Sequence, residues 1–456
     1  MLTVIDPSKG NLLHEYPTND AASVEQILKT AAETFKSWRE TSFAARAGVL
    51  KNVVHYMRDN IETLAPLMTE EMGKPIKEAR GEVKKSAWCA EHYAEHAEAY
   101  LATETLASDA SSSYVQYLPL GTVLGILPWN APFWLAFRFL APALMAGNTC
   151  VMKHDSHVPA CSLAIAEIFE KVNGPAGIFQ SLLLKSSNIE AVIRDSRIQA
   201  VSFTGSDKGG SSVASIAASE IKPAVLELGG SDPCVVLADA DLEKAADIIT
   251  LSRIINAGQS CIAVKRIIAE ESVCEHLVLL LKERLAALKV GDPRKESTDI
   301  GPIARKDLRD HLHRQVQETI AAGATCVLGG ELPKGDGFFY PVTLLTNVEP
   351  GMAAFREETF GPVAAVTRAR DEQHAMELAN DTPYGLAASI WTEASRGEAL
   401  AGQFAAGQVA VNGIVKTDPR LPSGGIKRSG YGRELGPHGI HEFVNAQQVW
   451  VGPATG

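Results

Sequence analysis

Short apolar runs alternate with stretches of helical apolar spacing along most of the chain after residue 121. The runs are TVLGIL (122–127), NTCVMK (148–153), AVSFT (200–204), PCVVL (233–237), RIIAE (266–270) and CVLGG (326–330). Strands that alternate with helices form βαβ units, and such units build parallel sheets. The alternation stops near Glu227 and then starts again, so the sequence predicts two α/β domains in series.

The segments outside this alternation show other patterns. The first hundred residues are predicted to be helical, because apolar residues recur at helical spacing from Val24 to Trp38 and the same style continues. The small polar stretch ASDASSS (107–113) ends this pattern, and YVQYLPLG (114–121) alternates like a strand. The C-terminal VNAQQVWVG (444–452) resembles a final strand.

Length and charge exclude several classes of protein. With 456 residues, 46% of them hydrophobic, the chain is long enough for more than one sizeable core. A net charge of −11 argues against a nucleic-acid partner, since phosphate backbones bind basic surfaces. Residues 120–137 carry no charge and reach the length of a membrane span, but Pro128 and Pro132 interrupt them. We therefore expect a buried strand–turn–helix there and no membrane partner.

The cysteines and the N-terminus indicate the compartment. The seven cysteines are an odd number and include neither a C-x-x-C pair nor a cluster with histidine. Neither a disulfide framework nor a metal site is therefore expected. The N-terminus lacks the basic and apolar regions of a signal peptide. Reduced thiols and the absence of a signal peptide predict a cytoplasmic protein.

Three residues combine a reactive group with an unusual local context. Cys261 follows a Gly-Gln-Ser turn, where we expect an exposed thiol with a stabilised thiolate, whereas the other cysteines lie in apolar runs typical of a core. Glu227 lies in an apolar run, and burial there would raise its pKa into the range of a general base; a solvated strand edge is the alternative. The amide of Asn130, between two prolines, is placed to donate to an oxyanion, or is a simple turn residue.

Two α/β domains suggest a dinucleotide cofactor, but the sequence lacks the G-x-G-x-x-G fingerprint. Gly430 and Gly432 begin such a pattern, and Leu435 takes the place of its last glycine. What remains is FTGS (203–206), which follows a predicted strand and would open a helix N-terminus toward a phosphate. A plain strand-to-helix turn explains the same residues.

Seven segments taken together resemble the NAD(P)-dependent aldehyde dehydrogenase superfamily over nearly the whole chain. They are PWNAPFW (128–134), PALMAGNTCVMK (142–153), FTGS (203–206), LELGGSDP (226–233), GQSC (258–261), EETFGPV (357–363) and PSGGIKRSGYGRE (422–434). Their order and separations make the combination far more specific than any one segment. The superfamily also lacks the G-x-G-x-x-G fingerprint, which accounts for its absence here.

The resemblance implies the oxidation of an aldehyde to a carboxylic acid. Cys261 corresponds to the nucleophile that forms a thiohemiacetal and, after hydride transfer to the nicotinamide, a thioester. Asn130 and the backbone N–H of Cys261 correspond to the oxyanion hole, and Glu227 to the base that activates water for hydrolysis. No metal is needed. A CoA-acylating enzyme and a non-catalytic structural protein are alternatives, which the presence of all three residues argues against.

The cofactor residues are implied in the same way. Lys153 corresponds to the lysine that contacts the adenosine ribose, Ser206 lies by the pyrophosphate, and Glu358 and Phe360 lie by the nicotinamide ribose and ring. The implied cofactor residues are Trp129, Lys153, Ser156, Gly205, Ser206, Glu358 and Phe360.

Ser156 favours NADP over NAD. Many NAD-dependent members have a glutamate three residues after the lysine, where it binds both ribose hydroxyls and would repel a 2′-phosphate. Serine at this position donates a hydrogen bond to that phosphate instead. Asp155 is an adjacent carboxylate that would restore the repulsion, and a protonated His154 would offset it. NAD therefore stays the alternative.

Within the superfamily, the chain looks closest to the bacterial succinate-semialdehyde dehydrogenases. Arg138, eight residues after Asn130, corresponds to an arginine that binds the substrate carboxylate in some of them, since a guanidinium binds a carboxylate bidentately. The alternative is a structural arginine that pairs with an acidic neighbour. A second arginine found six residues before the cysteine in some members is replaced here by Ile255. The other substrates considered are glutarate semialdehyde and uncharged aliphatic or aromatic aldehydes.

The loop before PSGG supplies two further candidates for the substrate site. Arg420 would provide a second positive charge, and Ser423 stands where the family usually has phenylalanine. A serine there would widen the pocket or offer a hydroxyl to a substrate carboxylate.

The resemblance also implies the architecture, an aldehyde dehydrogenase-like α/β fold with two Rossmann-type domains and a β oligomerisation element. The cofactor-binding domain would span 1–105 and 119–228, and the catalytic domain 229–432. The oligomerisation element would combine 106–118 with 433–456, because strands at a sheet edge can pair across subunits. A homodimer or homotetramer is the expected assembly.

Overall fold

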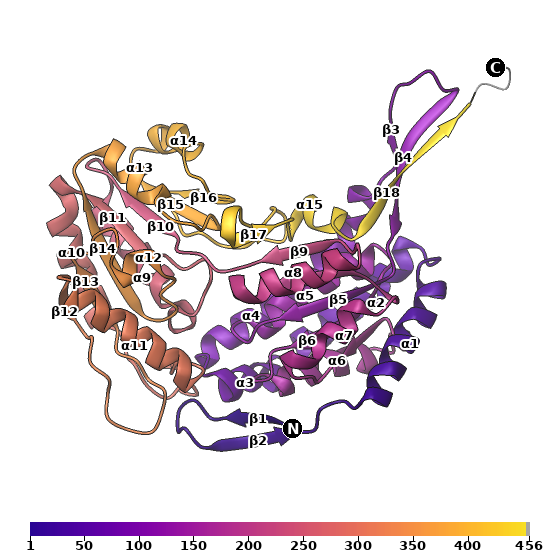
Figure 1. The fold of residues 1–456 in the computed structure, drawn as a ribbon, viewed down its shortest axis with the longest axis horizontal. Helices are drawn as coiled ribbons and strands as arrows, with labels where there is room; N and C mark the ends of the chain where they lie inside the picture. The colour runs from indigo at the N-terminus through magenta and orange to yellow at the C-terminus, as the bar shows by residue number, and fades with distance from the viewer. Residues whose placement is uncertain (453–456) are drawn as a thin grey trace.

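Two largely parallel sheets face each other across the centre of the molecule (Figure 1). The structure is a computed structural model and describes residues 1–452. The first sheet has the strand order β17-β9-β8-β5-β6-β7, and only β17 is antiparallel to its neighbour. Its strands are β5 (Thr122–Leu127), β6 (Thr149–His154), β7 (Phe179–Ser181), β8 (Ile198–Thr204), β9 (Ala224–Glu227) and β17 (Gly430–Tyr431).

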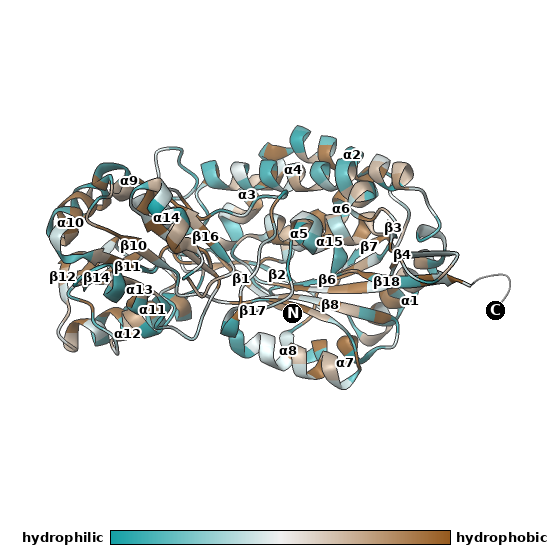
Figure 2. Ribbon diagram, turned by 90° about the horizontal axis from the view of Figure 1, so that it is seen from above, coloured by the Kyte–Doolittle hydropathy of each residue, from teal (hydrophilic) through white to brown (hydrophobic). Residues whose placement is uncertain are grey.

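Helices cover both faces of this first sheet (Figure 2). Because successive side chains of a strand point to opposite faces, Val123 packs into one core and Leu124 into the other. The core around Val123 contains α2 (Phe43–Asp59), α3 (Ile61–Met72), α4 (Ile76–Tyr100), α5 (Pro132–Met145) and α6 (Pro159–Lys171). The core around Leu124 contains α1 (Ala21–Trp38), α7 (Ile189–Arg194) and α8 (Asp207–Ser219).

The second sheet is built in the same way, in the order β12-β13-β14-β11-β10-β15-β16, and only β12 is antiparallel. Its strands are β10 (Pro233–Val236), β11 (Arg266–Glu270), β12 (Thr325–Leu328), β13 (Thr343–Thr346), β14 (Val363–Ala369), β15 (Ala387–Trp391) and β16 (Gln408–Val411). One face packs on α9 (Leu242–Ile254) and α10 (Glu271–Ala286). The other packs on α11 (Lys306–Ala321), α12 (Ala353–Arg356), α13 (Glu372–Asn380) and α14 (Ala394–Ala401).

The link between β9 and β10 determines how the two sheets meet. Residues 228–232 run directly from the carboxyl end of β9 to the amino end of β10. The carboxyl edge of the first sheet therefore faces the amino edge of the second. In the first sheet this edge includes the switch point between β5 and β8, where ligands bind in open α/β sheets.

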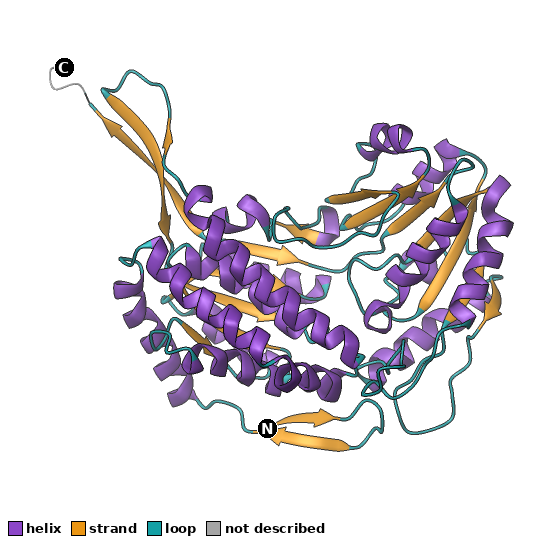
Figure 3. Ribbon diagram, turned by 180° about the vertical axis from the view of Figure 1, so that it is seen from behind, coloured by secondary structure: helices purple, strands orange, loops and turns teal. Residues whose placement is uncertain are grey.

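A third sheet, in the order β18-β4-β3, forms an arm that projects from the body (Figures 1 and 3). It consists of β3 (Glu104–Thr105), β4 (Ser112–Pro119) and β18 (Val444–Val451), which follows α15 (Gly436–His441). Strands β4 and β18 pair antiparallel from Pro119–Val444 to Ser112–Val451. Residues 453–456 of the predicted oligomerisation element lie outside the described residues.

The predicted α/β fold and the strands read from the apolar runs are confirmed. The prediction of helix throughout the first hundred residues is wrong at the start, where β1 (Leu2–Ile5) and β2 (Leu12–Tyr16) form an antiparallel hairpin before α1. Residues 120–137 form β5 and the first part of α5, both buried, as expected. Among the described residues, no helix is long and apolar enough to cross a membrane.

Candidate active site

Cys261 lies in a tightly held loop between the 3-10 helix η2 (Ile255–Gly258) and β11. Asn256 and Ala257 adopt positive φ angles of 55°, a strained backbone for residues with a side chain. The Gln259 side chain closes the turn, donating to the carbonyl of Asn256 at 3.0 Å and accepting from the N–H of Ala304 at 2.9 Å. These bonds support the strained backbone just before the thiol.

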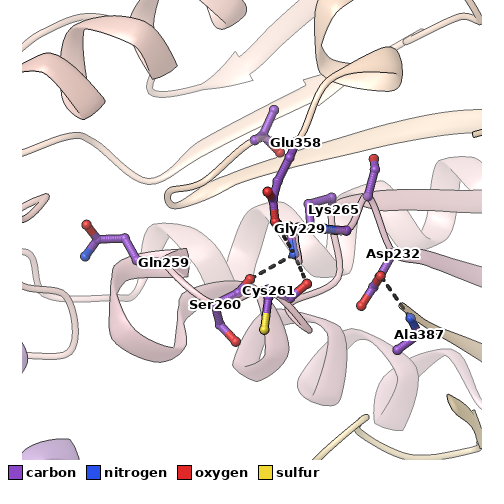
Figure 4. A network of polar contacts seen from close by, with 12 residues as sticks. Gly229, Asp232, Gln259, Ser260, Cys261, Lys265, Glu358 and Ala387 are labelled. Atoms are coloured by element: carbon purple, nitrogen blue, oxygen red, sulfur yellow. Dashed lines mark hydrogen bonds and ion pairs between the residues drawn. The ribbon is translucent and has the colours of Figure 1, made fainter. Parts of the chain in front are cut away.

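Lys265 holds the same loop from the other side (Figure 4). Its fully buried ammonium donates to the carbonyl oxygens of Ser260, at 2.8 Å, and of Cys261, and it lies 3.4 Å from the Glu358 carboxylate. Glu358 also accepts the N–H of Gly230 at 3.2 Å. The loop of the nucleophile is thereby connected to the segment that precedes β14.

The Cys261 thiol is half-buried, not exposed as expected. Burial raises its pKa to about 11, although the charges of Lys265 and Arg138 lower it in part. The expectation of a stabilised thiolate in the resting protein is therefore wrong, and the thiol needs a base to take its proton at neutral pH. Of the other six cysteines, five are buried as expected and Cys326 is half-buried.

Glu227 ends β9 with a side chain that is only 5% exposed, which excludes the solvated strand edge. Burial raises the pKa of this carboxyl to about 7, against the lowering effect of Arg138. One oxygen, Oε2, accepts from Arg138 Nη2 at 3.2 Å, and Oε1 has no hydrogen-bond partner among the described residues. The charge of Glu227 raises the pKa of Cys261, so the two groups are close enough to interact. A free, buried carboxyl oxygen of this pKa suits a general base.

Asn130 lies against the backbone that leads to Cys261. Its amide donates to the carbonyl of Gln259 at 3.1 Å. Its own carbonyl accepts from the amide of Asn256 and the ammonium of Lys74, each at 2.9 Å. This network places an amide donor beside the nucleophile, as an oxyanion hole requires.

A cavity of about 550 Å³ lies between the two sheets. Asn130, Arg138 and Cys261 line it, together with residues from α4, α5, the end of α9 and the segment 414–417. The pocket is bounded mainly by apolar atoms with a few polar groups, as is typical of a small-molecule site.

The structure does not bring the three predicted substrate residues together at the cavity. Arg138 is 3% exposed and pairs with both Glu227 and Glu434, which is the structural alternative to carboxylate binding. Arg420 is largely exposed, pairs with Asp418 at 2.7 Å and does not line the cavity. Ser423 is buried and bonded through its backbone to Glu434, also away from the cavity wall.

Five of the predicted cofactor residues lie at the same carboxyl edge of the first sheet as Asn130 and Glu227, namely Trp129, Lys153, Ser156, Gly205 and Ser206, whereas Glu358 and Phe360 precede β14 of the second sheet. Ser206 caps α8, with its hydroxyl accepting from the N–H of Gly209 at 3.2 Å. A side chain at Gly205 would come within 2.8 Å of the Phe203 ring, so this turn needs glycine. Trp129 and Phe360 meet edge to face across the gap between the sheets, with ring centroids 5.8 Å apart.

Lys153 lies near the carboxyl end of β6, and Ser156 follows that strand. Lys153 is 4% exposed and donates to the Ser186 hydroxyl at 3.3 Å, and within residues 1–452 it has no carboxylate within 4.0 Å. Burial would raise the pKa of Asp155, but the hydrogen bond and charge of His157 hold it at about 2. The proposed offset by His154 is wrong, because burial lowers its pKa to about 4 and leaves it neutral. His157 contacts this carboxylate instead, with Nδ1 2.6 Å from Asp155 Oδ1.

Three residues of the site were not singled out from the sequence. Glu434 is the last residue of the segment PSGGIKRSGYGRE, Lys265 directly precedes the strand RIIAE, and Lys85 lies on a helix predicted from its apolar spacing alone. A lysine between the apolar CIAV and the buried strand RIIAE was a signal for Lys265. Glu434 and Lys85 gave none that separates them from surface charges.

Two Rossmann-type halves that enclose a cysteine, a buried carboxyl and an amide donor define a class of α/β oxidoreductases. The chain belongs to the aldehyde dehydrogenase family, whose model matches residues 1–449. A probable succinate-semialdehyde dehydrogenase [NADP(+)] from Synechocystis is 48% identical over 99% of both chains. Succinate semialdehyde dehydrogenase [NAD(P)+] Sad from Escherichia coli is 44% identical over 98% of this chain and 97% of its own.

Solved structures agree with this assignment. Succinic semialdehyde dehydrogenase from Streptococcus pyogenes, in complex with NADP+ as the cofactor, superposes with a TM-score of 0.97 at 31% identity. The alignment covers 99% of this chain and 100% of that one. The fold predicted from the sequence resemblance is thereby confirmed.

Proposed function

We propose that this protein oxidises succinate semialdehyde to succinate with NADP as the hydride acceptor. The observation that carries the chemistry is that Cys261 and Asn130 line one cavity at the junction of the two sheets and that the buried Glu227 lies close enough for its charge to act on the Cys261 thiol. The relatives named above supply the substrate class and the cofactor.

In the first half of the reaction, Glu227 accepts the proton of the Cys261 thiol, and the sulfur attacks the aldehyde carbon. The Asn130 amide and the N–H of Cys261 stabilise the oxyanion of the thiohemiacetal, a contact typically worth about 10²–10³ in rate. A nicotinamide held by Trp129, Glu358 and Phe360 would supply the hydride acceptor for that carbon, and loss of the hydride would leave a thioester on Cys261. Once its first proton has passed to solvent, Glu227 removes a proton from water, whose oxygen attacks the thioester. Collapse of this adduct breaks the C–S bond, and the proton held by Glu227 passes to the departing sulfur, which releases the acid and the thiol.

The residues at the carboxyl ends of β6 and β8 fit a dinucleotide that carries a 2′-phosphate. A buried lysine without a carboxylate partner in the described chain indicates that its counter-charge comes from a ligand, and Lys153 is such a residue. Ser186 adds a hydroxyl beside it, Ser156 follows three residues later in the chain, and His157 contacts the nearby Asp155 carboxylate. We assign the 2′-phosphate of NADP to Lys153 and Ser156, the pyrophosphate to Gly205 and Ser206, and the nicotinamide half to Trp129, Glu358 and Phe360.

We further propose that the first sheet and its helices form the cofactor-binding domain and that the second sheet forms the catalytic domain. The arm of β3, β4 and β18 would be the oligomerisation element of a homodimer or homotetramer. A cytoplasmic location follows from the same proposal.

Initial rates with succinate semialdehyde test this function, with NADP+ and NAD+ compared at limiting and saturating aldehyde. We expect the higher kcat/KM with NADP+ and a clear preference for succinate semialdehyde over butanal. Acyl-CoA formation in the presence of CoA would overturn the hydrolytic mechanism. Equal rates with butanal would overturn the substrate but not the chemistry of Cys261.

A further inference from the structure

The side chain of Lys265 is fully buried, and its ammonium is surrounded by three acceptors (Figure 4). It donates to the carbonyl oxygens of Ser260, at 2.8 Å, and of Cys261, and it lies 3.4 Å from Glu358 Oε1. Because an ammonium carries three protons, these acceptors match its donors one for one. The backbone N–H of Lys265 donates to the carbonyl of Asp232 at 3.0 Å, just before β11 begins. The lysine is therefore a rigid support for whatever it holds.

The two carbonyls that Lys265 holds belong to the two peptide groups that flank Cys261. In a planar trans peptide the C=O and the N–H point in opposite directions. The carbonyl of Ser260 points to the ammonium, so the N–H of Cys261, which belongs to the same peptide group, points away from it. Within residues 1–452, this N–H donates to no acceptor.

A free N–H at Cys261 is placed to serve a ligand. Backbone N–H groups without an acceptor are uncommon in folded proteins, and this one belongs to a half-buried residue that lines the cavity together with Asn130. The Asn130 amide uses one of its two N–H groups on the Gln259 carbonyl, at 3.1 Å, and the other has no acceptor among the described residues. Two free donors beside one thiol match an oxygen that gains negative charge when the sulfur attacks.

The other buried cation of this loop holds different peptide groups. Arg253 donates to the carbonyls of Gly258, at 2.6 Å, and of Val264, at 2.8 Å. In the part of the chain that the structure describes, Lys265 is the one side chain that donates to the carbonyls of Ser260 and Cys261. The direction of the N–H of Cys261 therefore depends on this lysine.

We propose that Lys265 is a positioning residue of the oxyanion hole. By holding the carbonyl of Ser260, it directs the N–H of Cys261 toward the reacting oxygen, and by holding the carbonyl of Cys261, it fixes the backbone that carries the thiol. Lys265 does not line the cavity, so it acts through these peptide groups and not on the aldehyde itself. The inference rests on the proposed function, because an oxyanion forms only when Cys261 adds to an aldehyde.

The test compares two reactions of the same thiol in Lys265→Met, both at saturating NADP+. Oxidation of butanal passes through an oxyanion, whereas alkylation by iodoacetamide displaces iodide from a saturated carbon and forms none. Both reactions need the thiolate, so a higher thiol pKa slows both by a common factor, which cancels when one loss is divided by the other. We expect alkylation to be slowed about 2- to 10-fold and kcat/KM for butanal to fall by a further factor of about 10 to 100.

Three further variants provide controls. Lys244→Met removes the charge of an exposed lysine that pairs with Asp241, and it should change neither reaction. Asn130→Ala removes the second donor, and it should slow butanal oxidation without slowing alkylation. Burial raises the pKa of Asp232 and Lys265 lowers it, so this carboxyl loses its cation in Lys265→Met. If that variant folds poorly, Lys265→Met/Asp232→Asn removes the stranded acid and should show the same ratio of the two losses.

The ratio of the two losses decides the outcome. Equal losses in alkylation and oxidation would show general damage to the loop and overturn the proposal. Unaltered alkylation in Lys265→Met would show that the loop keeps its form without the ammonium, and it would overturn the proposal as well. A wild-type protein that oxidises no aldehyde with NADP+ or NAD+ would instead refute the proposed function.

Discussion

Replacing Arg138 by methionine should move the pH dependence of turnover and leave substrate preference unchanged. Arg138 Nη2 lies 3.2 Å from Glu227 Oε2, and both side chains are at most 5% exposed. With an effective dielectric constant near 20, their attraction is about 5 kcal/mol, and it favours the ionised carboxylate. Burial opposes it, and the balance is a pKa of about 7. Since one pH unit corresponds to about 1.4 kcal/mol, losing even a quarter of the attraction shifts the pKa upward by about one unit.

The direction of this pH shift follows from the ionisation state in which Glu227 is catalytically active. The base acts as the carboxylate, so activity falls as the pH drops through its pKa. In Arg138→Met this fall should occur at higher pH, with reduced turnover at pH 7 that recovers in alkaline solution. The measurement is kcat against pH for succinate semialdehyde and butanal, and both curves should move together.

A double variant provides the control. Glu434 is the second carboxylate on Arg138, so Arg138→Met/Glu434→Gln removes the repulsion that would remain and should bring the curve partly back. Unfolding in denaturant should show a loss of roughly 3–5 kcal/mol for the single variant, because a buried partner is left unpaired, and a smaller loss for the double variant. An unchanged pH curve, or a loss confined to succinate semialdehyde, would refute this reading of Arg138.

Three further outcomes are expected. Asn130→Ala should lower kcat by about 10²–10³ for every aldehyde while NADP+ binding is kept, as measured by titration; a change in KM alone would contradict the oxyanion role. Ser156→Glu should reverse the preference from NADP+ to NAD+ in kcat/KM, since a carboxylate repels the 2′-phosphate; unchanged preference would place the phosphate elsewhere. Lys265→Met should reduce kcat for both aldehydes and slow alkylation of Cys261 by iodoacetamide, because the ammonium lowers the thiol pKa and holds the Ser260 and Cys261 carbonyls; unaltered alkylation would limit Lys265 to a packing role.

The parts of the site that could be predicted are those with a local signature. Cys261 stands after a turn, Asn130 between two prolines and Glu227 in an apolar run, and each pattern is readable within ten residues. The strand–helix alternation predicts the same edge of the sheet for several of them, because parallel strands end together. The hairpin of β1 and β2 gave only a weak pattern, because β1 alternates over just four residues and β2 is largely exposed and does not alternate.

The sequence patterns could not predict which charged side chains form ion pairs with one another. Arg138 lies 89 residues before Glu227 in the sequence and is much farther from Glu434. The three side chains meet only because β9, α5 and the segment after β17 pack together. The same packing leaves Lys85 without a carboxylate partner within residues 1–452 and brings His157 against Asp155.

The sequence by itself thus determined the fold class and the reactive groups, because backbone periodicity and local context depend on neighbours along the chain. Only the tertiary structure determined that burial raises the pKa of the Cys261 thiol and that Arg138 pairs with two buried carboxylates. It likewise determined that Lys85 has no carboxylate partner among the described residues. Burial and Coulomb interactions depend on distance in space, and a low-dielectric interior makes them strong enough to set the chemistry.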